Sequence, residues 1–187
     1  VKLESENKVF IMGSGTIGLL IALFAKNNGC NVYVGTRKER NCEFIKSLGL
    51  EVINTNKLED EIKSITNGEG FKYVFEAVGS NESISNCIMA SGNFGKIVLV
   101  GNPHDDLKLD KQIYWKILRK QLTMVGTWNS NYNTKVNDWQ DSLEFMKENY
   151  ATFKKLITNT YELCEYEEAF DLLRDSNKPK IKIMFKM

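Results

Sequence analysis

The stretch VFIMGSGTIG, residues 9–18, decides the fold that we expect for this chain of 187 residues. Its first four residues are apolar, enough for a buried strand, and they run into glycines at Gly13, Gly15 and Gly18. Beyond the glycines, apolar residues recur at the spacing of one helix face, which we expect to face the core: Ile17, Leu20, Ile21 and Phe24. A β-rich run, residues 31–34, comes next. The glycines therefore lie between a strand and a helix of a βαβ unit, the setting in which GxGxxG indicates a dinucleotide site.

Each glycine of this motif has its own physical role. Gly13 permits a tight turn, Gly15 lets the backbone approach a pyrophosphate, and Gly18 lets the helix pack closely on the strand. The start of the helix adds unpaired N–H groups and the positive end of the helix dipole. We expect cofactor contacts from the whole turn: Gly13, Gly15, Thr16, Ile17 and Gly18. The alternative is a tight turn that binds no ligand.

The end of the second strand bears on which dinucleotide is bound. An NAD site usually carries Asp or Glu about 20 residues after the glycines, where it binds the ribose 2′-hydroxyl. Here Thr36 takes that place, in the run GTRK of residues 35–38, and the first carboxylate comes only at Glu39. A small hydroxyl residue leaves room for a 2′-phosphate, which a guanidinium binds through two parallel hydrogen bonds. The sequence therefore favours NADP over NAD, with contacts from Thr36, Arg37 and Arg40. The alternative is a solvated basic turn that opens the next helix.

Composition narrows the class of protein. With 42% hydrophobic and 26% charged residues the chain is typical of a globular domain, and its net charge of +1 gives no indication of a nucleic-acid partner. The cysteines lie far apart without a CxxC pair, which favours free thiols in a reducing cytoplasm over a disulfide framework or a structural zinc site. No apolar run approaches the roughly 18 residues of a membrane span, and the first residues do not resemble a signal peptide. We expect a cytoplasmic protein without a membrane or nucleic-acid partner.

Apolar runs and helical patterns alternate along most of the chain. Strands are expected at residues 9–12, 31–34, 51–53, 73–75, 96–100 and 122–125, with helices between them. This alternation predicts an α/β fold, a Rossmann-type doubly wound parallel sheet of six strands in the order 3-2-1-4-5-6. In such a sheet the carboxyl ends of the strands meet at one edge, where ligands bind.

The pattern changes near residue 150. Before it, a helix is expected to turn Trp139, Leu143 and Met146 towards a core. After it come a short extended run, another helix, and a last strand at 180–185 in which lysines alternate with apolar residues. We expect a dinucleotide-binding domain at residues 1–150 and a C-terminal helix-strand return segment at residues 151–187.

With these residues assembled, the chain resembles the cofactor-binding domain of the medium-chain dehydrogenase/reductases, the zinc alcohol and polyol dehydrogenase family. The resemblance covers nearly the whole chain, and its markers are residues 9–18, 75–79, 98–103, 122–128, 157–161 and 168–170. One stretch, residues 114–130, is similar more narrowly to the polyol-phosphate branch, the galactitol-1-phosphate 5-dehydrogenases.

The resemblance implies further cofactor contacts. Val78 and Gly79 follow the fourth strand, where the family binds the riboses, and a turn without a ligand is the alternative. Other residues fall where the family's backbone holds the nicotinamide carboxamide, and plain strand ends are the alternative: Gly101, Thr127 and Asn129. Lys182 aligns with a basic residue that reaches the pyrophosphate, and a solvated lysine is the alternative.

The family also carries parts that this chain lacks. Its members supply the catalytic zinc ligands from an N-terminal GroES-like domain, and many have a structural zinc loop built on cysteines. His104 is the single histidine here and cannot build a catalytic zinc site, which takes about three protein ligands. We therefore expect no catalytic and no metal-binding residues in this chain, zinc only in an absent catalytic domain, and no turnover by this part alone. The family further implies a homodimer or tetramer, joined through the edge strand at residues 122–125.

Two functions of different classes stay open. The first is the cofactor-binding part of a zinc-dependent alcohol, polyol or polyol-phosphate dehydrogenase, which transfers a hydride between NADP(H) and its substrate. The second is a non-catalytic NAD(P)-binding module, which the fold alone does not exclude.

Overall fold

A computed structural model describes residues 2–37, 39–175 and 177–187. By its internal contacts the described chain divides into two compact units, one up to Thr127 and one from Trp128 onward. The functional division expected at residue 150 is a separate matter and stays a prediction.

Among the described residues, the first unit contains a six-stranded sheet in the order β3-β2-β1-β4-β5-β6, with all neighbouring strands parallel. The strands are β1 (Lys8–Met12), β2 (Asn31–Thr36), β3 (Glu51–Asn54), β4 (Phe71–Glu76), β5 (Ser91–Leu99) and β6 (Thr123–Gly126). The predicted fold class and strand order are confirmed. Register places Met12 level with Gly35 of β2 and with Glu76 of β4. The glycine turn therefore leaves the sheet between the ends of two neighbouring strands.

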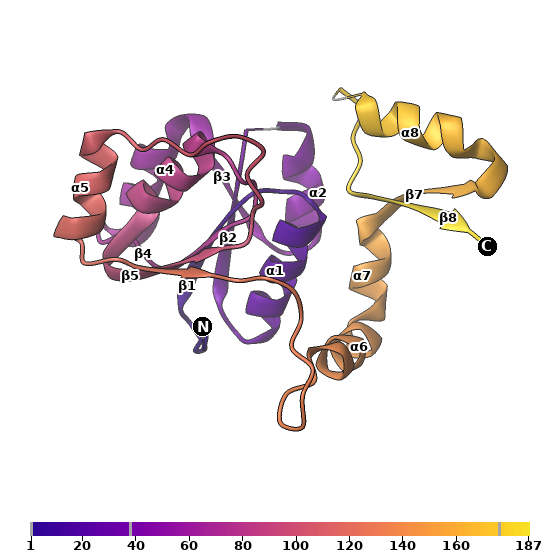
Figure 1. Ribbon diagram of the computed structural model, residues 1–187, viewed down its shortest axis with the longest axis horizontal. Coiled ribbons are helices and arrows are strands. Elements are labelled where there is room, and N and C mark those ends of the chain that lie inside the picture. Colours follow the sequence, from indigo (N-terminus) through magenta and orange to yellow (C-terminus); the bar gives the residue numbers. More distant parts are fainter. Residues whose placement is uncertain (1, 38, 176) are drawn as a thin grey trace. The chain divides into compact units, whose positions relative to one another are not determined.

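Helices cover both faces of this sheet (Figure 1). They are α1 (Thr16–Asn27), α2 (Cys42–Ser47), α3 (Leu58–Thr66), α4 (Asn81–Ala90) and α5 (Lys111–Arg119). The residues of β1 alternate between the faces, as a pleated strand requires. Ile11 approaches Gly18 of α1, whereas Phe10 and Met12 belong to a core cluster with Ile84 of α4. No helix in the described residues is long and apolar enough to cross a membrane.

The buried face of α1 differs from the one expected. Ile17 is 58% exposed and Phe24 is 36% exposed, so the predicted apolar stripe does not face the core. The buried residues are Gly18, Leu19, Ala22, Leu23 and Ala25. The reason is steric: α1 lies against the glycine turn through Gly18, where a Cβ atom would overlap the carbonyl oxygen of Gly13. The prediction used only the spacing of large apolar residues, and a glycine does not add to that pattern. It therefore selected the face of α1 beside the one that is buried.

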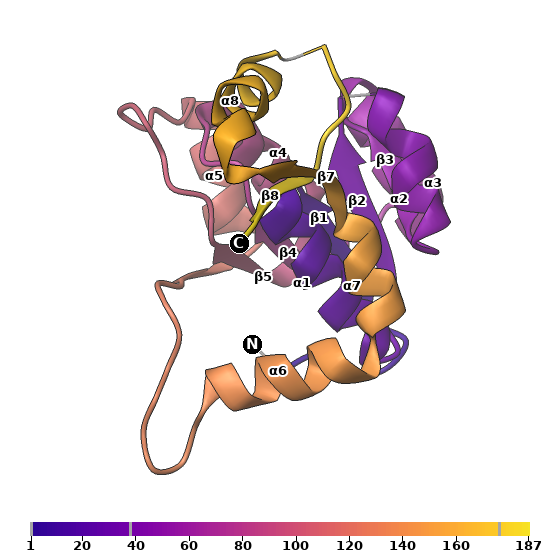
Figure 2. The ribbon, with the colours of Figure 1, turned by 90° about the vertical axis from the view of Figure 1, so that its right-hand side faces the viewer.

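The second unit contains α6 (Asp138–Glu148), α7 (Tyr150–Leu156), β7 (Ile157–Glu162), α8 (Tyr166–Arg174) and β8 (Lys182–Lys186). Strands β7 and β8 pair in parallel, and α8 lies beside them (Figure 2). The expected C-terminal helix-strand segment is therefore present. Along β8 the exposed residues Lys182, Met184 and Lys186 alternate with half-buried Ile183 and Phe185, so the strand is half exposed, as predicted.

The core face expected for α6 is wrong. Trp139 and Leu143 are each 64% exposed and Met146 is 46% exposed. The residue that α6 buries is Phe145, whose ring packs edge to face on that of Phe153 in α7, with centroids 5.3 Å apart. This aromatic pair joins the two helices, and it lies on a different face of α6 from the three predicted residues.

Candidate functional site

A pocket of about 360 Å³ opens at the carboxyl edge of the sheet. The ends of β1, β2 and β4 and the start of α4 form its walls. The lining residues are Met12, Gly13, Ser14, Gly15, Gly35, Thr36, Arg37, Ala77, Val78, Ser80, Glu82 and Ser83. The pocket therefore lies where an open parallel sheet binds ligands, at the point where the strand order reverses between β1 and β4.

The glycine turn forms the floor of this pocket under tight steric constraint. Gly13 has φ of +123°, which L side chains rarely adopt, and a Cβ there would lie 3.0 Å from Cγ2 of Val78. At Gly18 a Cβ would overlap the Gly13 carbonyl oxygen. These two glycines are thus required by the packing of the protein itself, as the sequence predicted.

Gly15 is different, because no protein atom explains its lack of a side chain. It has φ of −80° and ψ of 178°, which any residue adopts, and a Cβ there would meet nothing within 4 Å. It is the N-cap of α1, and among the described residues no side chain caps that helix or places an acidic group in its first turn. A helix start of this kind offers backbone N–H groups and the positive end of the helix dipole to an anion.

A buried hydrogen-bond network ties the glycine turn to the end of β2. The hydroxyls of Ser14 and Thr36 lie 3.0 Å apart, and Nδ2 of Asn41 donates to Oγ of Ser14 at 3.0 Å. All three side chains are buried. The sequence named Thr36 as a cofactor contact but missed Ser14 and Asn41. Small polar residues that join two loops carry no periodic signal, and only the fold brings them together.

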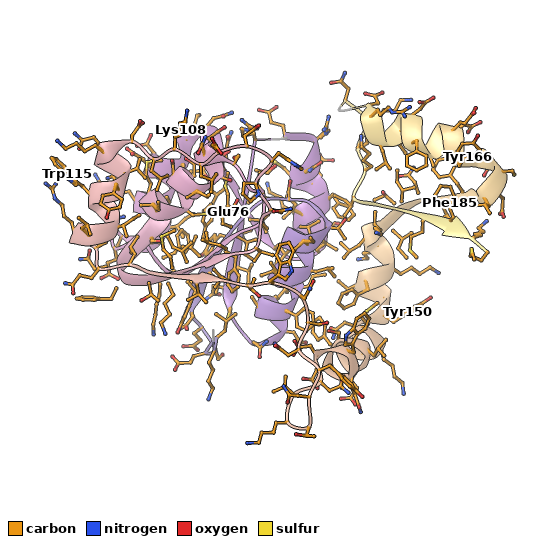
Figure 3. The ribbon with its side chains drawn as sticks, viewed as in Figure 1. Glu76, Lys108, Trp115, Tyr150, Tyr166 and Phe185 are labelled. Atoms are coloured by element: carbon orange, nitrogen blue, oxygen red, sulfur yellow. The ribbon has the colours of Figure 1, made fainter. Side chains whose placement is uncertain are left out.

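A buried carboxylate fixes the backbone of the pocket wall at the end of β4. Glu76, at the end of β4, is 1% exposed, and its Oε1 accepts hydrogen bonds from the backbone N–H groups of Val78 and Gly79, each at 2.9 Å. Figure 3 labels Glu76 among the side chains of the first unit. Burial, with a further contribution from the Glu76 charge, raises the pKa of the Cys87 thiol well above its usual range. Cys87 thus stays a neutral thiol and is no candidate nucleophile.

The turns after β4 and β5 fit closely against each other. Gly79 has φ of +81°, and a Cβ there would lie 2.6 Å from the carbonyl oxygen of Asn102. A Cβ on Gly101 would lie 2.5 Å from Oε2 of Glu76. The structure therefore brings Val78, Gly79 and Gly101 together, and it gives both glycines a packing role in addition to the cofactor role predicted for them.

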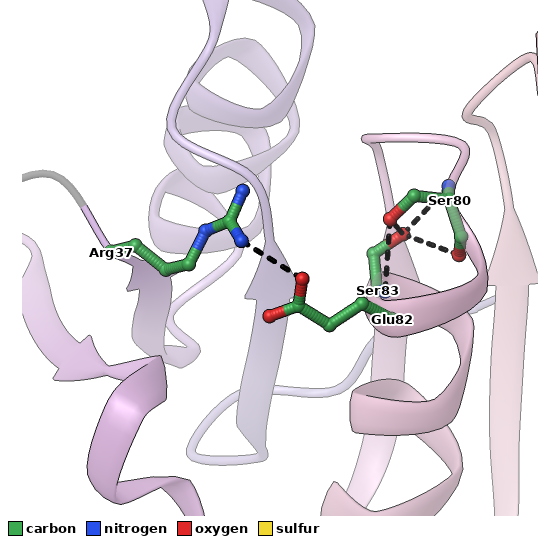
Figure 4. Close-up of polar contacts among 4 residues, drawn as sticks. All are labelled: Arg37, Ser80, Glu82 and Ser83. Carbon is green, nitrogen blue, oxygen red and sulfur yellow. Dashed lines mark hydrogen bonds and ion pairs between the residues drawn. The ribbon is translucent and has the colours of Figure 1, made fainter.

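The basic side of the pocket contains an ion pair. Nη1 of Arg37 lies 2.8 Å from Oε2 of Glu82, near the start of α4 (Figure 4). Both side chains are more than half exposed and both line the pocket. Arg40 is exposed in the short helix after β2, and among the described residues it is not part of the pocket lining. Lys38, which belongs to the same basic run, lies outside the described residues.

The remaining predicted contacts lie elsewhere. The N–H of Thr127 donates to the carbonyl of Leu99 at 3.1 Å, which fixes the end of β6 beside β5. Asn129, with φ of +55°, and Lys182, exposed at the start of β8, belong to the second unit. Their role as cofactor contacts stays a prediction, as does that of each other residue named from the sequence.

The described residues do not form a metal site. In residues 2–37, 39–175 and 177–187, no three His, Cys, Asp or Glu side chains come together in a way that would hold a metal ion. These residues therefore do not fit a zinc ion, and we assign no step to one here.

A family of sequences described as zinc-binding dehydrogenase matches residues 16–148, more than half of the chain. The chain belongs to the zinc-binding dehydrogenase family. The match begins at the first residue of α1 and ends with α6, so it includes β2 to β6, whereas β1 and the turn up to Gly15 precede it.

Individual proteins are similar to this chain as well. An uncharacterised zinc-type alcohol dehydrogenase-like protein of Haemophilus influenzae is 30% identical over 97% of this chain and 52% of the relative. Galactitol 1-phosphate 5-dehydrogenase of Escherichia coli K12 is 27% identical over 96% of this chain and 54% of the relative. The chain thus spans about half the length of the relatives that it matches.

Solved structures support the fold. The crystal structure of galactitol-1-phosphate dehydrogenase from Escherichia coli superposes with a TM-score of 0.82, at 23% identity, over 94% of this chain and 52% of that chain. At that identity the likeness establishes the architecture alone.

Proposed function

We propose that this chain is the cofactor-binding part of a zinc-dependent alcohol or polyol dehydrogenase and that its pocket binds a nicotinamide dinucleotide, NADP(H) in preference to NAD(H). The observation that carries the proposal is Gly15. It is the one position of the motif where the lack of a side chain has no explanation inside the protein, and it lies at the start of a helix without a side-chain cap. A pyrophosphate is the group for which such a backbone is suited.

Different pocket residues would bind different parts of such a ligand. The N–H groups at the start of α1 would bind the pyrophosphate, while Gly13 and Gly18 set the turn that presents them. The Ser14–Thr36–Asn41 network fixes the distance between that turn and the end of β2, where the adenosine ribose would lie. Glu76 holds the backbone of Val78 and Gly79 in place beneath the riboses. The bound cofactor would supply hydride transfer, and the protein would supply its position.

The preference for NADP rests on Arg37 and on the lack of a carboxylate at Thr36. Arg37 lines the pocket and its guanidinium is more than half exposed, so it is accessible to a 2′-phosphate. We expect Arg37→Ala to weaken NADPH binding by about 1.5–3 kcal/mol, the usual loss for a hydrogen bond to a charged group, and to leave NADH binding nearly unchanged. Calorimetric titration of the wild type and the variant with both cofactors measures this.

The matched control is Arg40→Ala, which removes a second arginine of the same basic run that does not line the described pocket. It should weaken NADPH much less than Arg37→Ala does. If the wild type binds NADH more tightly than NADPH, the assignment of NADP is wrong. If it binds neither cofactor, the proposed function fails as a whole.

The substrate proposal is an alcohol, a polyol or a polyol phosphate. Its support is the family and the relative named galactitol 1-phosphate 5-dehydrogenase. We place the zinc and the substrate pocket in the remainder of an intact enzyme, since the described residues make no metal site. The scattered cysteines support the cytoplasmic location that we propose with it. A non-catalytic NAD(P)-binding module is the second candidate, because the fold alone does not decide between the two functions.

We also propose a homodimer joined through β6. This strand is an edge of the sheet, its residue Val125 is 40% exposed, and an unpaired edge readily pairs with another chain. Light scattering over a range of concentrations should show a dimer, and Val125→Lys should shift it towards the monomer by placing a charge on that edge. A wild-type chain that stays monomeric at high concentration would contradict this proposal.

A further inference from the structure

Glu82 lies opposite Arg37 across the mouth of the pocket. It is the second residue of α4, and its Oε2 lies 2.8 Å from Nη1 of Arg37 (Figure 4). The two residues come from different strand-helix connections and are 45 positions apart in the chain. Nothing in the sequence pattern assigned a role to Glu82.

The position of Glu82 is set by a well-anchored helix start. Ser80 and Ser83 form a reciprocal capping box, in which the N–H of Ser83 donates to Oγ of Ser80 at 3.1 Å and the N–H of Ser80 donates to Oγ of Ser83 at 2.9 Å. Gly79, just before them, packs on the backbone of Asn102. The backbone that carries Glu82 is therefore fixed, and only its exposed side chain is free to turn away from Arg37.

A guanidinium binds a carboxylate and a phosphate with the same donors. Arg37 offers one planar set of N–H groups, and a 2′-phosphate that uses that set in parallel displaces a carboxylate that already occupies it. Because both side chains are more than half exposed, the pair is weak and is exchanged at modest cost.

We propose that Glu82 is a specificity-determining residue that competes with the 2′-phosphate of NADP(H) for Arg37. The inference rests on the proposed function, because it needs a dinucleotide in the pocket and Arg37 as the phosphate ligand. Glu82 then lowers the affinity for NADP(H) and leaves that for NAD(H) unaltered, so it moderates the preference that Arg37 creates. NADPH should bind with Arg37 released from Glu82.

Glu82→Gln tests this with little change of shape. Titration of the full chain with NADPH at low salt should show binding about two- to fivefold tighter than in the wild type, the range expected from loss of an exposed pair, and NADH should change by less than about 1.5-fold. Glu59→Gln is the matched control. Glu59 is the second residue of α3, is exposed, and lies away from this pocket, so it removes the same charge from an equivalent helix position.

The double variant Arg37→Ala/Glu82→Gln separates competition from simple repulsion. If Glu82 acts through Arg37, the gain in NADPH affinity vanishes in the Arg37→Ala background. No gain in the single variant, or an equal gain in both backgrounds, overturns the inference. A loss of NADH affinity also overturns it, since it would show that Glu82 binds the ribose hydroxyl. Failure of the wild type to bind either cofactor would instead refute the proposed function.

Discussion

Glu76→Ala is expected to lower the free energy of unfolding by about 3–5 kcal/mol, the largest effect of any single change at the pocket. The substitution removes a buried side chain and leaves the N–H groups of Val78 and Gly79 without an acceptor. An unsatisfied buried donor costs about 1–3 kcal/mol, and the cavity adds to that. Denaturant unfolding followed by tryptophan fluorescence measures the change.

Two further variants make this expectation specific. Glu76→Gln keeps a carbonyl oxygen as an acceptor and should cost only about 1–2 kcal/mol. Glu69→Ala, which removes an exposed glutamate away from the pocket, should stay within about 0.5 kcal/mol of the wild type. If Glu76→Ala is no more destabilising than Glu69→Ala, the carboxylate does not hold the Val78–Gly79 turn as the structure indicates.

Gly18→Ala is expected to destabilise the chain by about 2–4 kcal/mol, although alanine normally favours a helix over glycine by about 1 kcal/mol. The reversal of sign has a steric cause, because the new methyl group would overlap the Gly13 carbonyl oxygen. Backbone cannot give way as a flexible side chain does, so the helix and the turn must separate. We also expect NADPH binding to weaken by about tenfold or more, because the turn that presents the pyrophosphate donors moves.

Gly15→Ala is the matched comparison at the neighbouring glycine of the motif. Its methyl group meets nothing within 4 Å and its backbone suits any residue, so stability should change by less than about 1 kcal/mol. NADPH binding should nevertheless fall by about tenfold or more, because the methyl group occupies the space proposed for the pyrophosphate. Equal losses of stability in the two variants, or undiminished binding by Gly15→Ala, would contradict the separate roles given to these glycines.

The fold could be predicted from the sequence because its signals are local. Short apolar strands, glycine-rich turns and helical spacing repeat along the first unit, and in a parallel sheet these suffice for the strand order and the position of the ligand edge. The exposed face of α1 shows the limit of this reasoning. Close packing through Gly18 decides which side of the helix is buried, and a pattern of apolar residues does not register a glycine.

The unpredicted part of the site depends on distant residues. Ser14 bonds to Thr36 and Asn41, and Arg37 pairs with Glu82, over separations of 22 to 45 residues. Polar residues of this kind are common in loops, so their types and spacing do not predict these contacts. The contacts form only because the fold brings the ends of distant strands together. Trp139 and Leu143 of α6 were misjudged for the opposite reason, because an amphipathic pattern states which residues share a face but not whether that face is covered.

A crystal structure of the chain with NADP⁺ tests the central claim most directly. We expect the pyrophosphate at the N–H groups that follow Gly15, the 2′-phosphate within hydrogen-bonding distance of the Arg37 guanidinium, and the Glu82 carboxylate turned away from that guanidinium. A dinucleotide bound outside this pocket, or one whose 2′-phosphate lies away from Arg37 while the Arg37–Glu82 pair stays intact, would contradict it.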